Sequence, residues 1–283
     1  MRVLSVFAAI CLFLGSSVRA GVLARFKMNN DIGTIDVELF EQDKPVTVSN
    51  FIAYVKSGAW HDTQIQRWHP GFVIQGGNYS MAHREDLKTP LAGTNRVHVH
   101  SFGNIPFEMN AGRFFSNGFG ALAMARGSDT NSASTDWFFN LADNTNLDTA
   151  GGGYVVFGRT VRGTNILNYF NPPFPFANLY SANDASLPQG SVLPVYSNDG
   201  VSAFFLNMDI TLLTAQISQV EGGNKISWNS VEGRPNIVEF SSTIPPTWQA
   251  VTTVTGTGAS MSVTNDPGRA TFRSYRVRID YTQ

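Results

Sequence analysis

The stretch Gln66–Gly77 reads Gln-Arg-Trp-His-Pro-Gly-Phe-Val-Ile-Gln-Gly-Gly and decides how the rest of the chain is interpreted. It contains one arginine, Arg67, and one uncharged amide, Gln75, but no obvious nucleophile or general base. A Pro-Gly pair between two β-prone runs is typical of a tight reversal, so we expect two neighbouring strands. Side chains alternate along a strand. The second strand is therefore predicted to project Phe72, Ile74 and Gly76 to one side, and Val73, Gln75 and Gly77 to the other.

Three blocks of sequence, which follow one another along the chain, contain recognisable motifs. Arg67, Pro70-Gly71-Phe72 and Gln75-Gly76-Gly77 follow Arg-x-x-Pro-Gly-Phe-x-x-Gln-Gly-Gly. The later blocks are Gly-Ala-Leu-Ala-Met-Ala at 120–125, and Trp-Phe-Phe-Asn at 137–140 followed by Asn-Leu-Asp at 146–148 and Val-Val-Phe-Gly at 155–158. Over roughly Gly33 to Leu213 the chain thus resembles the cyclophilin-type peptidyl-prolyl cis-trans isomerases. The resemblance implies a mainly β fold, a closed antiparallel β-barrel capped by two helices, with no cofactor and no metal.

The resemblance also implies roles for particular residues. Arg67 would be the electrostatic catalytic group, Gln75 a fixed amide for the peptide carbonyl, and Phe72 part of the proline pocket. The substrate-binding positions implied by the family pattern are Val73, Ala125, Arg126, Phe138, Asn146, Leu147 and Tyr154.

Several positions depart from the family pattern. Gln66 replaces a frequent His, Arg126 stands where Asn is common, and Asp136 stands where Gln or Glu is common. Tyr154 lies where many relatives carry His. Asn146 occupies the place of the bulky aromatic residue that helps to hold cyclosporin, so we expect retained activity with poor cyclosporin sensitivity.

The first twenty residues are typical of a secretory leader. Arg2 precedes an apolar run, and Val18-Arg19-Ala20 forms a small-x-small cleavage site. The run is too short to be a permanent membrane anchor. The alternative, a lipoprotein modified at Cys11, is disfavoured by Ile10, where a small residue is expected. We therefore expect cleavage after Ala20 and an exported monomer, periplasmic or extracellular, with no membrane anchor.

Composition sets further bounds. The 283 residues are 42% hydrophobic and 14% charged, enough for one large domain or two ordinary ones with real cores. Cys11 is the only cysteine, so the mature chain would contain no disulfide. Without Arg2 and Arg19, 18 basic residues face 21 acidic ones, a formal charge of −3. This charge favours neither nucleic acid nor an anionic membrane surface as a partner.

Periodicity predicts the local structure of the first part. Alternating apolar residues indicate a hairpin of strands at 22–28 and 35–39. A helix is expected after Asp43 as N-cap, with Val48, Phe51, Ile52 and Val55 on its apolar face and Gly58 at its end. A second, shorter helix is predicted from Thr164, with Ile166, Leu167 and Phe170 facing inward. Residues 171–200 are predicted to be a long surface excursion before a last strand at 201–213.

A His-Val-His pattern at 98–100 leaves two interpretations open. On a strand, His98 and His100 would point to the same side and, with His83, could bind a metal. An exposed edge strand is the favoured interpretation, because no cysteine or carboxylate cluster completes such a site.

The last seventy residues have a different character. Short strand-like runs at 225–228, 237–240, 261–263 and 274–281 are separated by turn residues. With Trp228 and Trp248 as core aromatics, residues 214–283 are predicted to form a small β-sandwich resembling fibronectin-like modules. The predicted organisation is therefore a leader at 1–20, an isomerase domain at 21–213 and this module.

Three functions remain open on the sequence alone. The first is a peptidyl-prolyl isomerase that acts on proline-containing stretches of exported or unfolded polypeptides. The second is a non-catalytic module that only binds proline-containing peptides. The third assigns the main role to the tail, as a carbohydrate-binding or cell-surface-binding module.

Overall fold

A computed structural model describes residues 22–28, 32–81, 96–171, 179–182, 188–196, 204–213, 215–243, 247–266, 268 and 274–280. The predicted leader and His83 lie outside the described residues. Within these ranges, no helix is long and apolar enough to cross a membrane.

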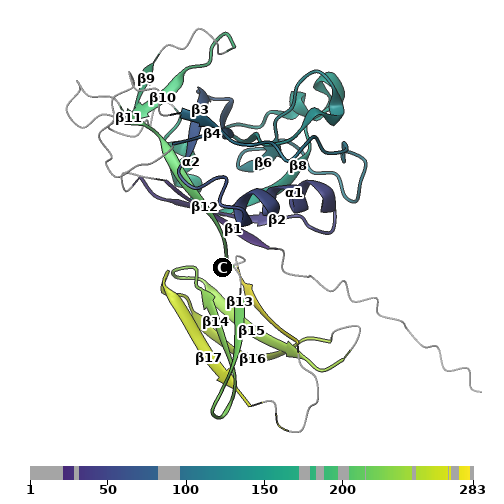
Figure 1. Ribbon diagram of the computed structural model, residues 1–283, viewed down its shortest axis with the longest axis vertical. Coiled ribbons are helices and arrows are strands. Elements are labelled where there is room, and N and C mark those ends of the chain that lie inside the picture. The colour runs from purple at the N-terminus through teal and green to yellow at the C-terminus, as the bar shows by residue number, and fades with distance from the viewer. Residues whose placement is uncertain are drawn as a thin grey trace, which may run out of the picture.

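A closed antiparallel barrel forms the first part of the chain (Figure 1). Its eight strands are β1 (Leu23–Met28), β2 (Thr34–Leu39), β3 (Thr63–His69), β4 (Val73–Met81), β6 (Ala121–Met124), β7 (Trp137–Asn140), β8 (Val156–Arg162) and β12 (Asn207–Leu213). They follow the order β3-β12-β1-β2-β8-β6-β7-β4, and pairing of β4 with β3 closes the ring. Strand β5 (Arg96–His98) adds to β4 as an edge strand. The predicted closed barrel is confirmed.

Aromatic rings fill the interior of the barrel. Phe26 of β1 packs edge to face on Trp137 and Phe139 of β7, with ring centroids 5.2 and 5.0 Å apart. Such pairs add stabilisation beyond the area that they bury. The β1–β2 hairpin brings Phe26 opposite Ile35, and both are fully buried. The predicted hairpin is therefore confirmed in its two strands.

Two helices pack on the barrel, as expected. Helix α1 (Pro45–Lys56) buries Phe51 against the rings of Phe26 and Phe157, and Gly58 follows it with a left-handed φ of +75°. Helix α2 (Thr164–Asn168) begins at the predicted residue. Short 3₁₀ turns η1 (Thr130–Ser132), η2 (Thr145–Asp148) and η3 (Ala150–Gly152) lie in the loops.

The predicted N-cap of α1 is wrong. Asp43 accepts hydrogen bonds from the backbone and guanidinium of Arg113 and makes no cap contact with the helix. The first N–H groups of the helix, those of Val46 and Thr47, instead donate to both carboxylate oxygens of Glu108, at 2.9 and 2.6 Å. A carboxylate favours the positive end of the helix dipole, so a distant loop replaces the local cap.

The segment after α2 is more ordered than the predicted surface excursion. Strands β9 (Leu179–Ala182), β10 (Leu193–Tyr196) and β11 (Phe204–Phe205) form a small sheet, and β10 is buried. The backbone groups of Val192 and Trp68 exchange two hydrogen bonds of 2.7 Å, which join this segment to β3. The excursion prediction is therefore wrong for residues 191–196, whereas the turn at 188–190 is exposed as expected.

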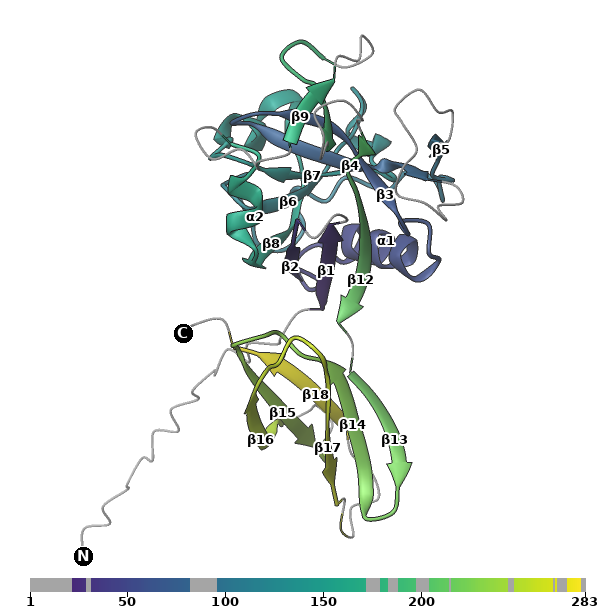
Figure 2. The same cartoon turned by 90° about the vertical axis from the view of Figure 1, so that its left-hand side faces the viewer.

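Two three-stranded sheets follow the barrel in sequence (Figure 2). One contains β13 (Ala215–Val220), β14 (Gly223–Asn229) and β17 (Ser260–Asn265), and the other contains β15 (Pro235–Ser241), β16 (Gln249–Thr255) and β18 (Ser274–Ile279). Ile226, Trp228 and Val238 form a buried cluster shared by both sheets, as in a small β-sandwich. Trp248 is not in this core, contrary to expectation, because its ring lies half-exposed under the Arg276 guanidinium, 4.3 Å away. The predicted domain boundaries and the fibronectin-like resemblance stay predictions.

Candidate active site

The pairing of β3 with β4 brings the two polar residues of the opening stretch together. Arg67 lies opposite Gln75 in the antiparallel register, and its Nη1 donates to Gln75 Oε1 at 3.3 Å. Gly71 adopts φ +70°, a conformation that a glycine takes without steric cost, so the tight reversal predicted at Pro70-Gly71 is present. Gln75 is thereby placed beside the guanidinium.

Arg67 is partly removed from water and has no acidic partner among the described residues. Its Nε donates to Ser191 Oγ at 2.9 Å, and within the described residues it forms no ion pair. Burial lowers the pKa of Arg67, an effect that the nearby Tyr154 partly opposes. Because an arginine pKa starts above about 12, the guanidinium still carries its charge at neutral pH. The site therefore contains a partly desolvated cation.

The partly buried carboxylate of Asp136 binds the side-chain amide of Gln75, which in turn contacts Arg67. Gln75 Nε2 donates to Asp136 Oδ1 at 3.2 Å, and Gln66 Nε2 makes a short hydrogen bond to the same oxygen. Thr135 Oγ1 donates to the other carboxylate oxygen at 2.8 Å. Gln66 and Asp136, two of the departures from the family pattern, thus contact each other directly and fix the orientation of Gln75.

An apolar cluster lies on the outer face of the barrel beside these residues. On β4, β6, β7 and β8, some of the side chains that project away from the interior are also apolar. The buried members are Val73, Ala121, Ala123, Phe138, Leu147 and Val156, with the partly buried Phe40, Phe72, Phe115, Ala125 and Tyr154 packed against them. The Arg67 guanidinium carbon is 6.0 Å from the centre of the Phe72 ring. The structure therefore brings Phe72, Val73, Ala125, Phe138, Leu147 and Tyr154 into one cluster.

Phe72 corrects the predicted alternation. It was expected to project with Ile74, which packs in the barrel interior, but it packs with Val73 in the outer cluster. The reason is that β4 begins at Val73, so Phe72 still belongs to the turn and does not follow strand geometry. Gly76 follows the prediction, since a Cβ there would lie 2.7 Å from the buried Trp137 ring.

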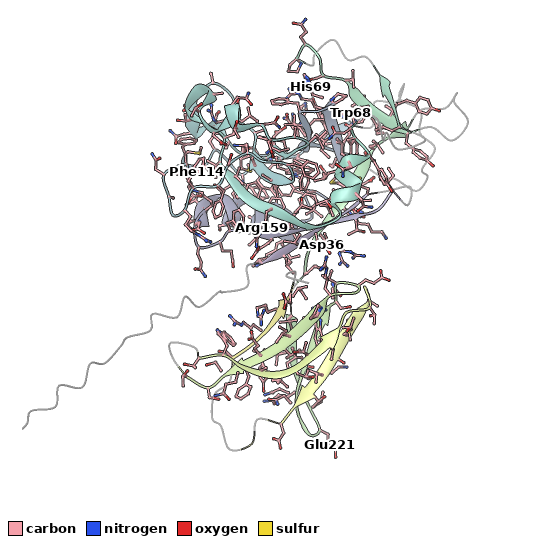
Figure 3. The ribbon with its side chains drawn as sticks, turned by 180° about the vertical axis from the view of Figure 1, so that it is seen from behind. Asp36, Trp68, His69, Phe114, Arg159 and Glu221 are labelled. Atoms are coloured by element: carbon pink, nitrogen blue, oxygen red, sulfur yellow. The ribbon has the colours of Figure 1, made fainter. Side chains whose placement is uncertain are left out.

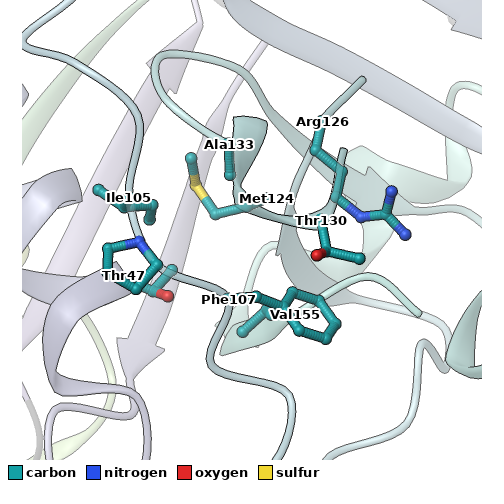
Figure 4. Close-up of a pocket in the computed structure, with 9 residues that line it drawn as sticks. Thr47, Ile105, Phe107, Met124, Arg126, Thr130, Ala133 and Val155 are labelled. Carbon is teal, nitrogen blue, oxygen red and sulfur yellow. The ribbon is translucent and has the colours of Figure 1, made fainter. Parts of the chain in front are cut away.

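Arg126 and Asn146 lie at the border of the cluster. The Arg126 guanidinium stacks on the Tyr154 ring at 4.6 Å, and its N–H groups donate to the carbonyls of Gly127, Gly151 and Gly153. Arg126 also lines a cavity of about 10 Å³ with Phe107 and Met124 (Figure 4). The N–H groups of Arg126 therefore bind backbone carbonyls of the loops. Asn146 is exposed on η2, next to the buried Leu147.

Ser191 is the site residue that the sequence analysis missed. It lies in the segment interpreted as a surface excursion, yet its hydroxyl contacts Arg67. The run Val192-Leu193-Pro194-Val195-Tyr196 after the turn residues Pro188-Gln189-Gly190 could have indicated a buried strand nearby. Nothing in the local sequence indicates which residue that strand would contact.

Comparison with known proteins decides the family. The family model described as "Cyclophilin type peptidyl-prolyl cis-trans isomerase/CLD" matches residues 24–178. The chain belongs to the cyclophilin-type peptidyl-prolyl isomerase family. The match begins earlier and ends earlier than the stretch of resemblance at 33–213, so residues 179–213 lie outside it.

Proteins named as peptidyl-prolyl cis-trans isomerases are similar to about half of the chain. A peptidyl-prolyl cis-trans isomerase of Acinetobacter baylyi is 32% identical over 144 residues, which cover 50% of this chain and 69% of that protein. One of Streptomyces antibioticus is 32% identical over 151 residues, 52% of this chain and 82% of that protein. A crystal structure of a Cryptosporidium parvum cyclophilin, determined in the presence of Ala-Pro, is 22% identical with a TM-score of 0.42, covering 67% of this chain and 98% of that one.

The Asp136 network predicts a pH dependence of stability. Burial raises the pKa of Asp136, although the hydrogen bonds from Thr135, Gln75 and Gln66 act in the opposite direction. The folded protein therefore binds this proton more tightly than the unfolded chain. The free energy of unfolding then falls as pH rises from the ordinary Asp value through the folded-state pKa. We predict that Asp136→Asn removes this loss and increases stability at neutral pH, as measured by urea denaturation from pH 4 to 8.

Glu221→Gln, at an exposed turn (Figure 3), is the control and should follow the wild type at every pH. A stability difference between wild type and Asp136→Asn that does not change with pH would contradict the prediction.

Proposed function

We propose that this cyclophilin catalyses cis–trans isomerisation of Xaa–Pro peptide bonds in exported or unfolded polypeptides. The observation that carries the proposal is the partly desolvated Arg67 guanidinium, held by Gln75 next to the apolar cluster around Phe72. The membership of the family and the names of the relatives support the same activity.

The reaction needs a lower rotational barrier and no covalent intermediate. The amide C–N bond has partial double-bond character, and its barrier is about 18–20 kcal/mol. Uncatalysed exchange takes roughly 10–100 s. Reaching on the order of a thousand turnovers per second requires a barrier lower by about 5–7 kcal/mol. Positioned charge and a matching apolar surface can supply this.

Arg67 would supply the electrostatic part. During rotation the prolyl nitrogen loses conjugation and gains a lone pair, which a guanidinium N–H can stabilise by about 1.5–3 kcal/mol. The effect is larger beside an apolar surface, where the effective dielectric constant is lower than in water. Without an acidic partner among the described residues, the Arg67 charge is available to the substrate.

The apolar cluster and Gln75 would position the substrate. Phe72, Val73, Phe138 and Leu147 would contact the proline ring and hold one side of the rotating bond. Both ends of the Gln75 amide already have protein partners, so its main role would be to orient Arg67. The second N–H of its Nε2 can still donate to a peptide carbonyl, the role implied by the family pattern.

We predict that Arg67→Ala lowers kcat/KM by about 10²- to 10³-fold, because it removes a preorganised donor to the transition state. A protease-coupled assay with a proline tetrapeptide measures the rate. Arg67→Lys keeps the charge but loses the planar fork, so it should restore only part of the activity.

The control for this assay is Arg159→Ala, since Arg159 is an exposed surface residue that pairs with Glu38. It should leave the rate unchanged. A wild type that binds the peptide without accelerating isomerisation would contradict the proposal and favour the binding-module alternative.

Cyclosporin should inhibit the wild type only weakly, because the exposed Asn146 offers no aromatic surface. We predict that Asn146→Trp tightens inhibition about tenfold through buried aromatic area. Inhibition titrations check both statements, and nanomolar inhibition of the wild type would contradict the first.

Export is the final part of the proposal, supported by the leader pattern of residues 1–20. N-terminal sequencing after expression in a bacterial host should begin at Gly21. Ala20→Leu should block cleavage because the small residue before the cut is lost. Recovery of wild-type protein that starts at Met1 would contradict export by this route.

A further inference from the structure

The segment 188–196 reaches the site from outside the region that the family model matches. Strand β10 and the residues before it follow position 178, where the match ends. Through this segment the Arg67 guanidinium has a second protein partner besides Gln75, the hydroxyl of Ser191. Trp68 and His69, the neighbours of Arg67 on β3, lie where the barrel faces this segment (Figure 3).

Two contacts fix the backbone on either side of Ser191. On one side, Val192 exchanges two hydrogen bonds of 2.7 Å with Trp68. On the other, Gly190 has a left-handed φ of +78° and lies so close to His69 that a Cβ would be 2.7 Å from its ring carbon Cε1. Because Val192 is hydrogen-bonded to Trp68 and Gly190 lies against the His69 ring, the Ser191 hydroxyl is held next to Arg67.

We propose that Ser191 is a positioning residue that fixes the Arg67 guanidinium for the isomerisation proposed above, on which this inference rests. Its Oγ accepts from Nε at 2.9 Å while Gln75 accepts from Nη1, so two contacts define the plane of the guanidinium. Nη2 has no hydrogen-bond partner among the described residues, which leaves it available to a prolyl nitrogen. Without these two contacts, the Arg67 side chain would be free to change rotamer before the reaction. It would then lose that conformational freedom only when the transition state forms.

The kinetic test compares wild type, Ser191→Ala and Ser191→Thr. Ser191→Ala should lower kcat about tenfold, the effect of one hydrogen bond to a charged group, with KM changed less than about twofold. Ser191→Thr keeps the hydroxyl and should restore most of kcat. Ser218→Ala, the same change at an exposed position of β13, should have no effect. A wild-type kcat in Ser191→Ala, or a change confined to KM, would overturn the proposal.

A double mutant tests whether Ser191 acts through Arg67. In the Arg67→Ala background, Ser191→Ala should cause no further loss, because the group that it positions is already absent. A tenfold loss that persists in this background would show that Ser191 acts on the substrate directly and would overturn the positioning role.

A measurement without substrate separates this inference from the proposed function. Exchange of the Arg67 Nε–H proton with water, followed by ¹⁵N NMR, should be about tenfold faster in Ser191→Ala than in wild type or Ser191→Thr, since the hydrogen bond protects that proton. Unchanged exchange would overturn the Ser191–Arg67 hydrogen bond as the positioning contact, even if activity fell. A wild type without isomerase activity but with Ser191-dependent exchange would refute the proposed function and leave this contact established.

Discussion

The pairing of β3 with β4 is the constraint on which the rest of the site depends. It closes the barrel, and the same register places Arg67 opposite Gln75. The chain reverses through Gly71 in a left-handed conformation, so Phe72 leaves the turn toward the outer cluster and not toward the interior. A slip of one residue in this pairing would exchange the interior and exterior faces of β4 and separate the arginine from its amide.

Strands β4, β6, β7 and β8 carry apolar residues on both faces of the barrel wall near the site. Ile74, Leu122, Phe139 and Phe157 fill the interior, whereas alternate residues of the same strands form the outer cluster. An antiparallel barrel facing water would ordinarily carry polar residues there. An apolar outer face bordered by a cation is suited to a ligand that is itself part apolar ring and part amide, as a proline peptide is.

In the proposed mechanism, the position of Asp136 would leave the Arg67 charge available to the substrate. A direct ion pair would satisfy the guanidinium and reduce its field at the substrate. Instead Gln75 stands between the two groups and accepts from Arg67 while it donates to Asp136. Gln66, Gln75 and Thr135 all donate to the carboxylate, so the dipoles of these groups compensate its partly buried negative charge.

Elements whose apolar residues repeat at strand or helix spacing could be predicted from the sequence. Features that depend on contacts between residues far apart in the sequence could not. The β1–β2 hairpin and both helices follow from alternating or helical apolar spacing, and the site cluster follows from the family pattern. The Glu108 cap of α1 and the Trp248–Arg276 stack join residues about 60 and 28 positions apart. The Ser191–Arg67 contact joins residues 124 positions apart. Such contacts exist only once the barrel has formed, so residue patterns along the chain do not specify them.

The central claim is that the Arg67 guanidinium acts on the nitrogen of a proline held against the outer cluster. A crystal structure of the protein with a bound Ala-Pro-containing peptide tests it most directly. The account predicts the proline ring against Phe72, Phe138 and Leu147, with an Arg67 N–H within hydrogen-bonding distance of the prolyl nitrogen. A peptide bound elsewhere, or an Arg67 turned away from a proline bound at the cluster, would contradict it.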